Sequence, residues 1–171
     1  MKSFKIAYTA MFAALICLAT WLLRLPIPGG VGIVHLGDFF IFAAAFFLGL
    51  RKAAMASAVG SSLANILMGL PIFAPATFII KGAMPIIVCL IVRGNFTMPK
   101  MVVAFATASA FMVVGYFWYV WLIFGWHYAV ADFFFGLIQP AVCITLALIA
   151  IPLLKQNPYL MQVRAQVTDN K

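Results

Sequence analysis

The sequence predicts an all-α, polytopic membrane protein, on the strength of its composition, its long uncharged runs and the position of its charges. Of the 171 residues, 67% are hydrophobic and only 8% are charged, and the mean hydropathy is +1.16. Soluble domains usually carry about a quarter charged residues. Several uncharged runs reach the ~18 residues that mark a membrane-spanning helix. These runs cover residues 6–23, 39–50, 53–80, 101–131 and 133–154. We therefore expect residues 1–171 to form a single membrane domain.

Turn-forming and polar segments divide this domain into six expected transmembrane helices. "LPIPGGVG" (25–32) and "GLPIFAP" (69–75) contain the prolines and glycines that end helices, and 51–52 and 93–100 are polar links. The break at "FGWHY" (124–128) is the least marked, but one helix across the whole run 101–131 would be about 46 Å long, against a hydrocarbon core of about 30 Å. The expected helices are 6–24, 36–50, 53–70, 76–93, 101–124 and 129–153, followed by a cytoplasmic tail at 155–171.

The basic residues predict which way the helices cross the membrane. With six spans both termini face one side, and that side receives nine of the 11 Lys and Arg residues. Cytoplasmic loops carry an excess of such residues, so we expect both termini to be cytoplasmic. These residues lie singly or in pairs at the ends of apolar runs, so the net charge of +8 does not indicate nucleic-acid binding. The nine are Lys2, Lys5, Arg51, Lys52, Arg93, Lys100, Lys155, Arg164 and Lys171.

Small residues recur at four-residue spacing in two of the expected helices. The helix 53–70 carries two such rows, and the helix 6–24 has Ala10 and Ala14. Small side chains let membrane helices approach one another closely. We interpret them as packing positions within the bundle; the two rows are Ala53, Ser57 and Ser61, and Ala56, Gly60 and Ala64.

Polar side chains gather in the outer half of the expected bundle, and the inner half has almost nothing ionisable. Pro85 and Pro140 lie beside them and free the backbone carbonyls of Lys81 and Gly136, which is tolerated only against protein or a water-filled cavity. We infer an outward-opening cavity lined by the helices 76–93, 101–124 and 129–153, below the connections 25–35 and 69–75. The polar residues are His35, Asp38, Asn65, Lys81, His127, Asp132 and Gln139.

Each of these residues also has a simpler explanation. Lys81 could extend to the outer headgroups, and Asp38 and Asp132 could each cap a helix. Tyr116 and Tyr119 lie in an aromatic segment typical of an interfacial belt, although their spacing predicts an inward-facing pair able to stack on a flat ligand. Because a lysine, two carboxylates and an amide converge, we predict that Lys81 is a ligand-site cation balanced by Asp132 or Asp38 in the empty protein.

The chain contains no recognisable catalytic or nucleotide-binding motif. It has no G-x-x-x-x-G-K-[ST] loop for ATP hydrolysis, no H-E-x-x-H and no nucleophile elbow. The three cysteines lack metal-ligand spacing, and we expect neither a metal nor a cofactor. A polar cavity confined to one side is not a pore. These features predict a binding subunit that needs an energising partner.

Two segments carry a resemblance to a known family. "PIPGG" followed by "HLGD" (26–38) and "APATFIIKG" (74–82) resemble the substrate-binding S components of energy-coupling factor vitamin transporters, and the resemblance extends over about residues 5–150. The branch is that of riboflavin, hydroxymethylpyrimidine and pyridoxine. The resemblance implies a prokaryotic cell membrane and a vitamin site near the outer face. It also implies two kinds of partner, a membrane coupling protein (the T component) and two ATPase subunits.

The resemblance also suggests roles for individual residues. It implies that Ala10 and Ala14 contact the coupling protein, and that Lys81 and Asp132 contribute to the vitamin site, beside the other candidates His35, Asp38, Asn65, Tyr116, Tyr119 and Gln139. Where riboflavin binders tend to carry a further lysine, this chain has only Gln139. We therefore expect hydroxymethylpyrimidine or pyridoxine first and riboflavin next.

Two other functions stay open at the level of the residues. Asp38 and Asp132 could form the carboxylate pair of an intramembrane aspartic-type hydrolase, although a nearby lysine would hold both acids ionised. A solitary ion-coupled carrier would need an ionisable group able to face inward, and the sequence offers none.

Overall fold

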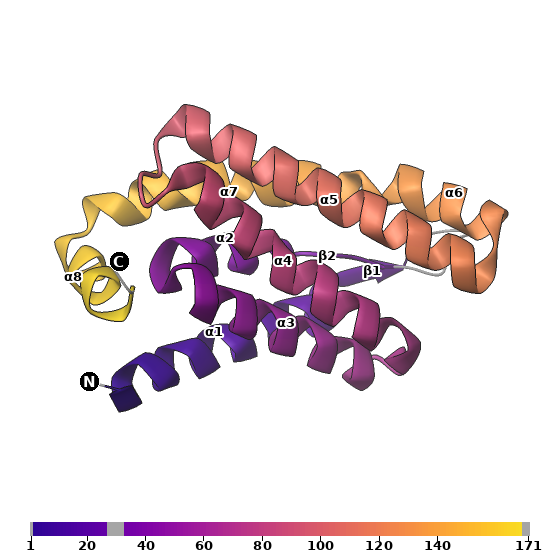
Figure 1. Cartoon of the computed structure of the whole chain (residues 1–171), viewed down its shortest axis with the longest axis horizontal. Coiled ribbons are helices and arrows are strands. Elements are labelled where there is room, and N and C mark those ends of the chain that lie inside the picture. The colour runs from indigo at the N-terminus through magenta and orange to yellow at the C-terminus, as the bar shows by residue number, and fades with distance from the viewer. Residues whose placement is uncertain (1, 27–32, 169–171) are drawn as a thin grey trace.

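The computed structural model describes residues 2–26 and 33–168 and consists almost entirely of helices. They run from α1 to α8, and the start of α1 lies at the same end of the bundle as α8, with α6 at the opposite end (Figure 1). The described elements are α1 (Lys2–Leu22), β1 (Arg24–Pro26), β2 (Ile33–His35), α2 (Gly37–Leu48), α3 (Leu50–Leu67), the 3₁₀ turn η1 (Pro71–Phe73), α4 (Ala74–Val92), α5 (Met98–Phe124), α6 (Trp126–Gly136), α7 (Ile138–Gln156) and α8 (Pro158–Val167).

The connection between α1 and α2, which the sequence predicts as a turn-rich segment, contains regular structure. Its two flanks pair as the short antiparallel strands β1 and β2, with Arg24 opposite His35 and Pro26 opposite Ile33. Backbone pairing satisfies the hydrogen-bonding groups of these flanks without a helix. This two-stranded ribbon of β1 and β2 is the one exception to an all-α fold among the described residues. Residues 27–32 of the connection lie outside the described part of the chain.

The breaks between α5, α6 and α7 follow from local backbone chemistry. Gly125 has a φ of 92°, a left-handed conformation that glycine adopts readily, and it separates α5 from α6 as the sequence predicts. The expected helix 129–153 is interrupted by a one-residue turn at Leu137, which divides it into α6 and α7, although Trp126–Gln156 remains one apolar segment long enough to cross a membrane. Pro140 lacks the N–H that would bond to the carbonyl of Gly136, which accounts for this break. Pro85, in contrast, lies inside a continuous α4.

Four helical segments of the described chain are long and apolar enough to cross a membrane, namely Ser3–Leu22, Pro71–Val92, Met98–Phe124 and Trp126–Gln156. The apolar α2 is shorter, with 12 residues, or about 18 Å. It lies in the centre of the bundle with Ile41, Phe42 and Phe46 fully buried, so it packs on protein rather than on lipid. The six-span count and the cytoplasmic termini stay predictions.

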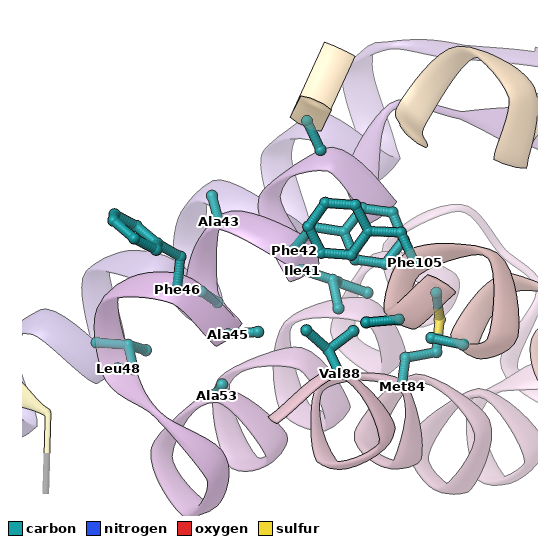
Figure 2. Close-up of a cluster of buried hydrophobic side chains, with 14 of the residues drawn as sticks. Ile41, Phe42, Ala43, Ala45, Phe46, Leu48, Ala53, Met84, Val88 and Phe105 are labelled. Carbon is teal, nitrogen blue, oxygen red and sulfur yellow. The ribbon is translucent and has the colours of Figure 1, made fainter. Parts of the chain in front are cut away.

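The core forms where α2 packs against α4 and α5. The rings of Phe42 and Phe105 stack with their centroids 4.3 Å apart, and Met84 and Val88 of α4 lie beside Ile41 (Figure 2). Both small-residue rows of α3 are buried, as the sequence predicts. At Gly60 the approach is close enough that a Cβ would lie 2.4 Å from the carbonyl oxygen of Ala13 on α1.

The expected tail folds back onto the bundle as α8. The side chain of Asn157 accepts hydrogen bonds from the backbone of Tyr159 and Leu160 and caps the start of α8. Arg164 donates to the carbonyl of Phe46 at 2.8 Å, and its guanidinium lies 4.4 Å from the centre of the Phe46 ring. These contacts hold α8 against the C-terminal end of α2.

Candidate functional site

A cavity lies on the side of the bundle formed by α4, α5, α6 and α7, towards the end that carries the ribbon. The end of α3, the turn η1 and strand β2 complete its wall. Its lining combines aromatic rings with a small number of polar groups, a composition typical of small-molecule sites. The lining residues are His35, Asn65, Leu70, Phe73, Thr77, Lys81, Met112, Val113, Tyr116, Phe117, Asp132, Phe133, Gly136 and Gln139.

Lys81 on α4 is buried in this wall and paired with Asp38 on α2. The Lys81 Nζ lies 2.5 Å from Oδ1 of Asp38, and the two side chains are 1% and 0% exposed. Nζ also lies 2.8 Å from the sulfur of Met112 and 5.6 Å from the centre of the Tyr116 ring. Lys81 therefore does not extend to the headgroups. Of the two acids that the sequence offered as its counter-charge, Asp38 is the one that binds it.

Gln139 on α7 connects this ion pair to strand β2. Its Nε2 donates to Oδ2 of Asp38 at 2.5 Å, and its Oε1 accepts from the backbone N–H of His35 at 3.1 Å. Both oxygens of Asp38 are thus engaged within the protein. Asp38 is fully buried behind Lys81 and is not among the residues that line the cavity.

A second hydrogen-bonded group forms the wall next to Lys81. Asn65 Nδ2 donates to Thr77 Oγ1 at 2.6 Å, and Thr77 Oγ1 lies 2.8 Å from the hydroxyl of Tyr116. Sequence reasoning missed Thr77. Its spacing could have revealed it, because Thr77 precedes Lys81 by four positions and so lies on the same face of the helix.

The other predicted residues divide into those at the cavity and those outside it. Asp132 lines the cavity from α6 and is partly buried. Tyr119 does not line it: its hydroxyl donates to the carbonyl of Ile72 and its ring packs on Phe73. The expected Tyr116–Tyr119 stacking pair is therefore separated. Exposed His127 also lies outside the lining.

His35 faces the cavity from β2 in its neutral form. Burial, assisted by the nearby Lys81 charge, lowers the pKa of His35 to about 4. Its Nδ1 accepts a hydrogen bond from the backbone N–H of Gly37 at 3.1 Å, so in the neutral ring the proton sits on Nε2. Within the described part of the chain, no group of three or more His, Cys, Asp or Glu side chains could hold a metal ion.

On α1, the predicted contact residues Ala10 and Ala14 are both exposed. They lie four positions apart and therefore on one face of the helix. The start of α1 lies at the end of the bundle where α8 lies (Figure 1).

The geometry does not favour an aspartic-type hydrolase. A shared-proton pair requires two carboxyl groups in direct contact with one proton between them. Asp38 instead accepts from Lys81 and Gln139 with its two oxygens, an arrangement that stabilises an ionised carboxylate.

The fold and the cavity thus define a class: a small helical membrane protein with a buried lysine in a polar, aromatic-lined cavity near one end. Residues 1–157 match the model of the family described as the S component of ECF-type riboflavin transporters. The chain belongs to this family, whose members are vitamin-transport subunits of energy-coupling factor transporters.

The chain is also similar to individual proteins. The thiamine precursor transporter HmpT of Lactococcus lactis subsp. cremoris is 29% identical over 154 residues, which are 90% of this chain and 89% of the relative. An uncharacterised protein of Pyrococcus woesei is 31% identical over 124 residues, 72% of this chain and 83% of the relative. A solved S component of a bacterial ECF transporter shares the fold, with a TM-score of 0.75, 16% identity and coverage of 91% of this chain and 98% of that one.

Proposed function

We propose that this chain is the substrate-binding subunit of an ATP-driven importer and captures a small heteroaromatic vitamin or precursor in the cavity described above. Hydroxymethylpyrimidine and pyridoxine are the preferred ligands, with riboflavin next. The observation that carries the proposal is the Lys81 ammonium, which is buried at the cavity wall and held by Asp38. Such a buried ionisable group within a membrane bundle marks a functional site by default.

The chemistry of the cavity suits a small substituted ring. The Tyr116 and Phe117 side chains offer aromatic surfaces for stacking. An ammonium has three N–H groups, so Lys81 can bind a ring nitrogen or oxygen while it keeps Asp38. The carboxylate of Asp132 is an acceptor for an amino or hydroxyl substituent.

Two considerations favour the smaller ligands over riboflavin. Gln139 is an uncharged amide that bonds to Asp38 and His35, and Lys81 is the only Lys or Arg among the described residues of the lining. The relative from Lactococcus lactis is described as a thiamine precursor transporter, and its name supports a compound of the size of a pyrimidine.

A ligand panel tests this proposal directly. Purified protein is titrated with hydroxymethylpyrimidine, pyridoxine and riboflavin, and one of them is expected to bind with sub-micromolar affinity. Lys81→Ala is expected to weaken that binding at least tenfold, because one charge-assisted hydrogen bond contributes about 1.5–3 kcal/mol. Lys100→Ala is the matched control, since Lys100 is exposed at the start of α5. If no compound binds, or if the two variants behave alike, the proposal fails.

The partners form the second part of the proposal. A membrane coupling protein and two ATPase subunits would supply the energy, and the exposed Ala10 and Ala14 would form part of the surface that contacts the coupling protein. Ala10→Trp and Ala14→Trp are expected to reduce co-purification of these partners without changing ligand affinity. Leu15→Trp is the control, because Leu15 is exposed on another face of α1. Equal losses in all three variants would contradict this assignment.

A further inference from the structure

Gln139 is placed so that its amide serves the protein rather than a ligand. It is 5% exposed, and both of its functional atoms have partners: Nε2 donates to Asp38 and Oε1 accepts from His35. Nε2 also lies 3.8 Å from the sulfur of Met112. Little hydrogen-bonding capacity is therefore left for a molecule in the cavity.

The three elements that meet at this amide are far apart in the sequence. Gln139 on α7 lies 101 positions from Asp38 on α2 and 104 from His35 on β2. Asp38 in turn binds the ammonium of Lys81 on α4. One amide thus joins the buried ion pair to the backbone of strand β2.

We infer that Gln139 is a positioning residue that holds the Lys81–Asp38 pair and strand β2 together as one hydrogen-bonded unit. Contact between a ligand and the Lys81 ammonium is then coupled, through Asp38 and Gln139, to the placement of β2 beside the cavity. The inference deepens the proposed function. Only its statement about the ligand rests on that function, because the contacts of Gln139 are present in the protein without a ligand.

The chemistry of the position explains why an amide is needed. The side chain must donate to a carboxylate at one atom and accept from a backbone N–H at another. A glutamate can accept from His35 but presents a second carboxylate to Asp38, and a methionine of similar length does neither. A swapped pair, Gln139→Glu with Asp38→Asn, restores both bonds: the amide introduced at position 38 would donate a hydrogen bond, and the carboxylate introduced at position 139 would accept it together with the His35 N–H. The swap also keeps one negative charge beside Lys81.

Hydrogen exchange in the ligand-free protein tests the inference. In Gln139→Met, amide exchange of peptides covering His35 is expected to accelerate about fivefold or more, the size expected for one lost hydrogen bond. Gln162→Met, at an exposed amide of α8, is the matched control and should leave this exchange unchanged. The swapped double variant should return the exchange to near the level of the unaltered protein. Gln139→Glu alone should not, because its carboxylate would be repelled by that of Asp38 and so be displaced from the His35 N–H.

Ligand kinetics then separate positioning from direct contact. For a compound that binds the unaltered protein, Gln139→Met is expected to raise the dissociation rate of the ligand at least fivefold. The swapped double variant is expected to bring this rate most of the way back to that of the unaltered protein. Unchanged exchange at His35 in Gln139→Met overturns the inference, as does a loss of affinity that the swap fails to rescue. If no compound of the panel binds, the proposed function fails, but the exchange measurements still decide the role of Gln139.

Discussion

The Lys81 ammonium and the Asp38 carboxylate form an ion pair 2.5 Å long between residues 43 positions apart, on α4 and α2. Both side chains are buried, so each charge depends on the other for compensation. Removing one partner of such a pair leaves an uncompensated charge and typically costs about 3–5 kcal/mol, whereas replacing both with apolar residues is often neutral.

This relationship predicts an asymmetric mutant series. Asp38→Leu and Lys81→Met should each destabilise the protein by about 3–5 kcal/mol, and the double variant should be closer to the unaltered protein than either single variant. Thermal unfolding in detergent measures the series. Ligand affinity should fall in all three variants, because all three alter the ammonium or its position. Additive losses of stability would show that the two charges do not compensate each other.

A second prediction distinguishes the two tyrosines. Tyr116 lines the cavity, whereas Tyr119 bonds to the backbone of Ile72 outside it. Tyr116→Ala should lower ligand affinity about tenfold, because it removes a stacking surface and the hydroxyl partner of Thr77. Tyr119→Phe should leave the affinity within about twofold. Binding titrations of the two variants check this prediction. An equal loss of ligand affinity in both would show that Tyr119 also contributes to ligand binding.

The boundaries of most helices could be predicted because they depend on local chemistry. Gly125 ends α5 through its left-handed backbone, and a charge or a proline marks other ends. The ribbon was missed, and the break at Leu137 was expected only as a kink beside Pro140 within one helix. The ribbon depends on pairing between segments that are separate in the sequence, and helical periodicity continues across the break without interruption.

The location of the site could be predicted from the sequence, but the identity of the acid that pairs with Lys81 could not. The outer-half position of Lys81 predicted a polar cavity, yet the sequence left both Asp38 and Asp132 as its counter-charge. Sequence spacing fixes which face of its own helix a residue occupies, but not how two helices are rotated towards each other. The same limit explains why the sequence could not show that the amide of Gln139, a residue of the cavity lining, bonds to Asp38 and His35.

A third prediction concerns the close approach of α1 and α3. A Cβ at Gly60 would lie 2.4 Å from the backbone oxygen of Ala13, so the two helices must separate to admit it. Gly60→Ala should therefore destabilise the protein by about 1–3 kcal/mol. Gly136→Ala is the matched control, since a Cβ there meets no atom within 4 Å. Thermal unfolding of both variants measures the difference in stability. Equal stability of the two would mean that α1 does not pack closely at Gly60.

The fourth prediction follows from the neutral His35. Its pKa is lowered from 6.5 to about 4, first by burial and then by the Lys81 charge. Because the folded-state pKa lies below the unfolded value, the folded state is favoured above pH 6.5 and loses this contribution as the pH falls from about 6.5 towards 4. The loss should reach about 1–2 kcal/mol at pH 5.

Unfolding temperatures measured from pH 8 to pH 5 test this prediction about His35. His35→Asn should flatten the pH dependence, because an asparagine does not titrate in this range. His127→Asn should keep it, since His127 is exposed and outside the cavity. The comparison is made between the two variants at each pH, so that any contribution of other groups is common to both. A pH profile of His35→Asn that matches that of the unaltered protein would show that folding does not lower the pKa of His35.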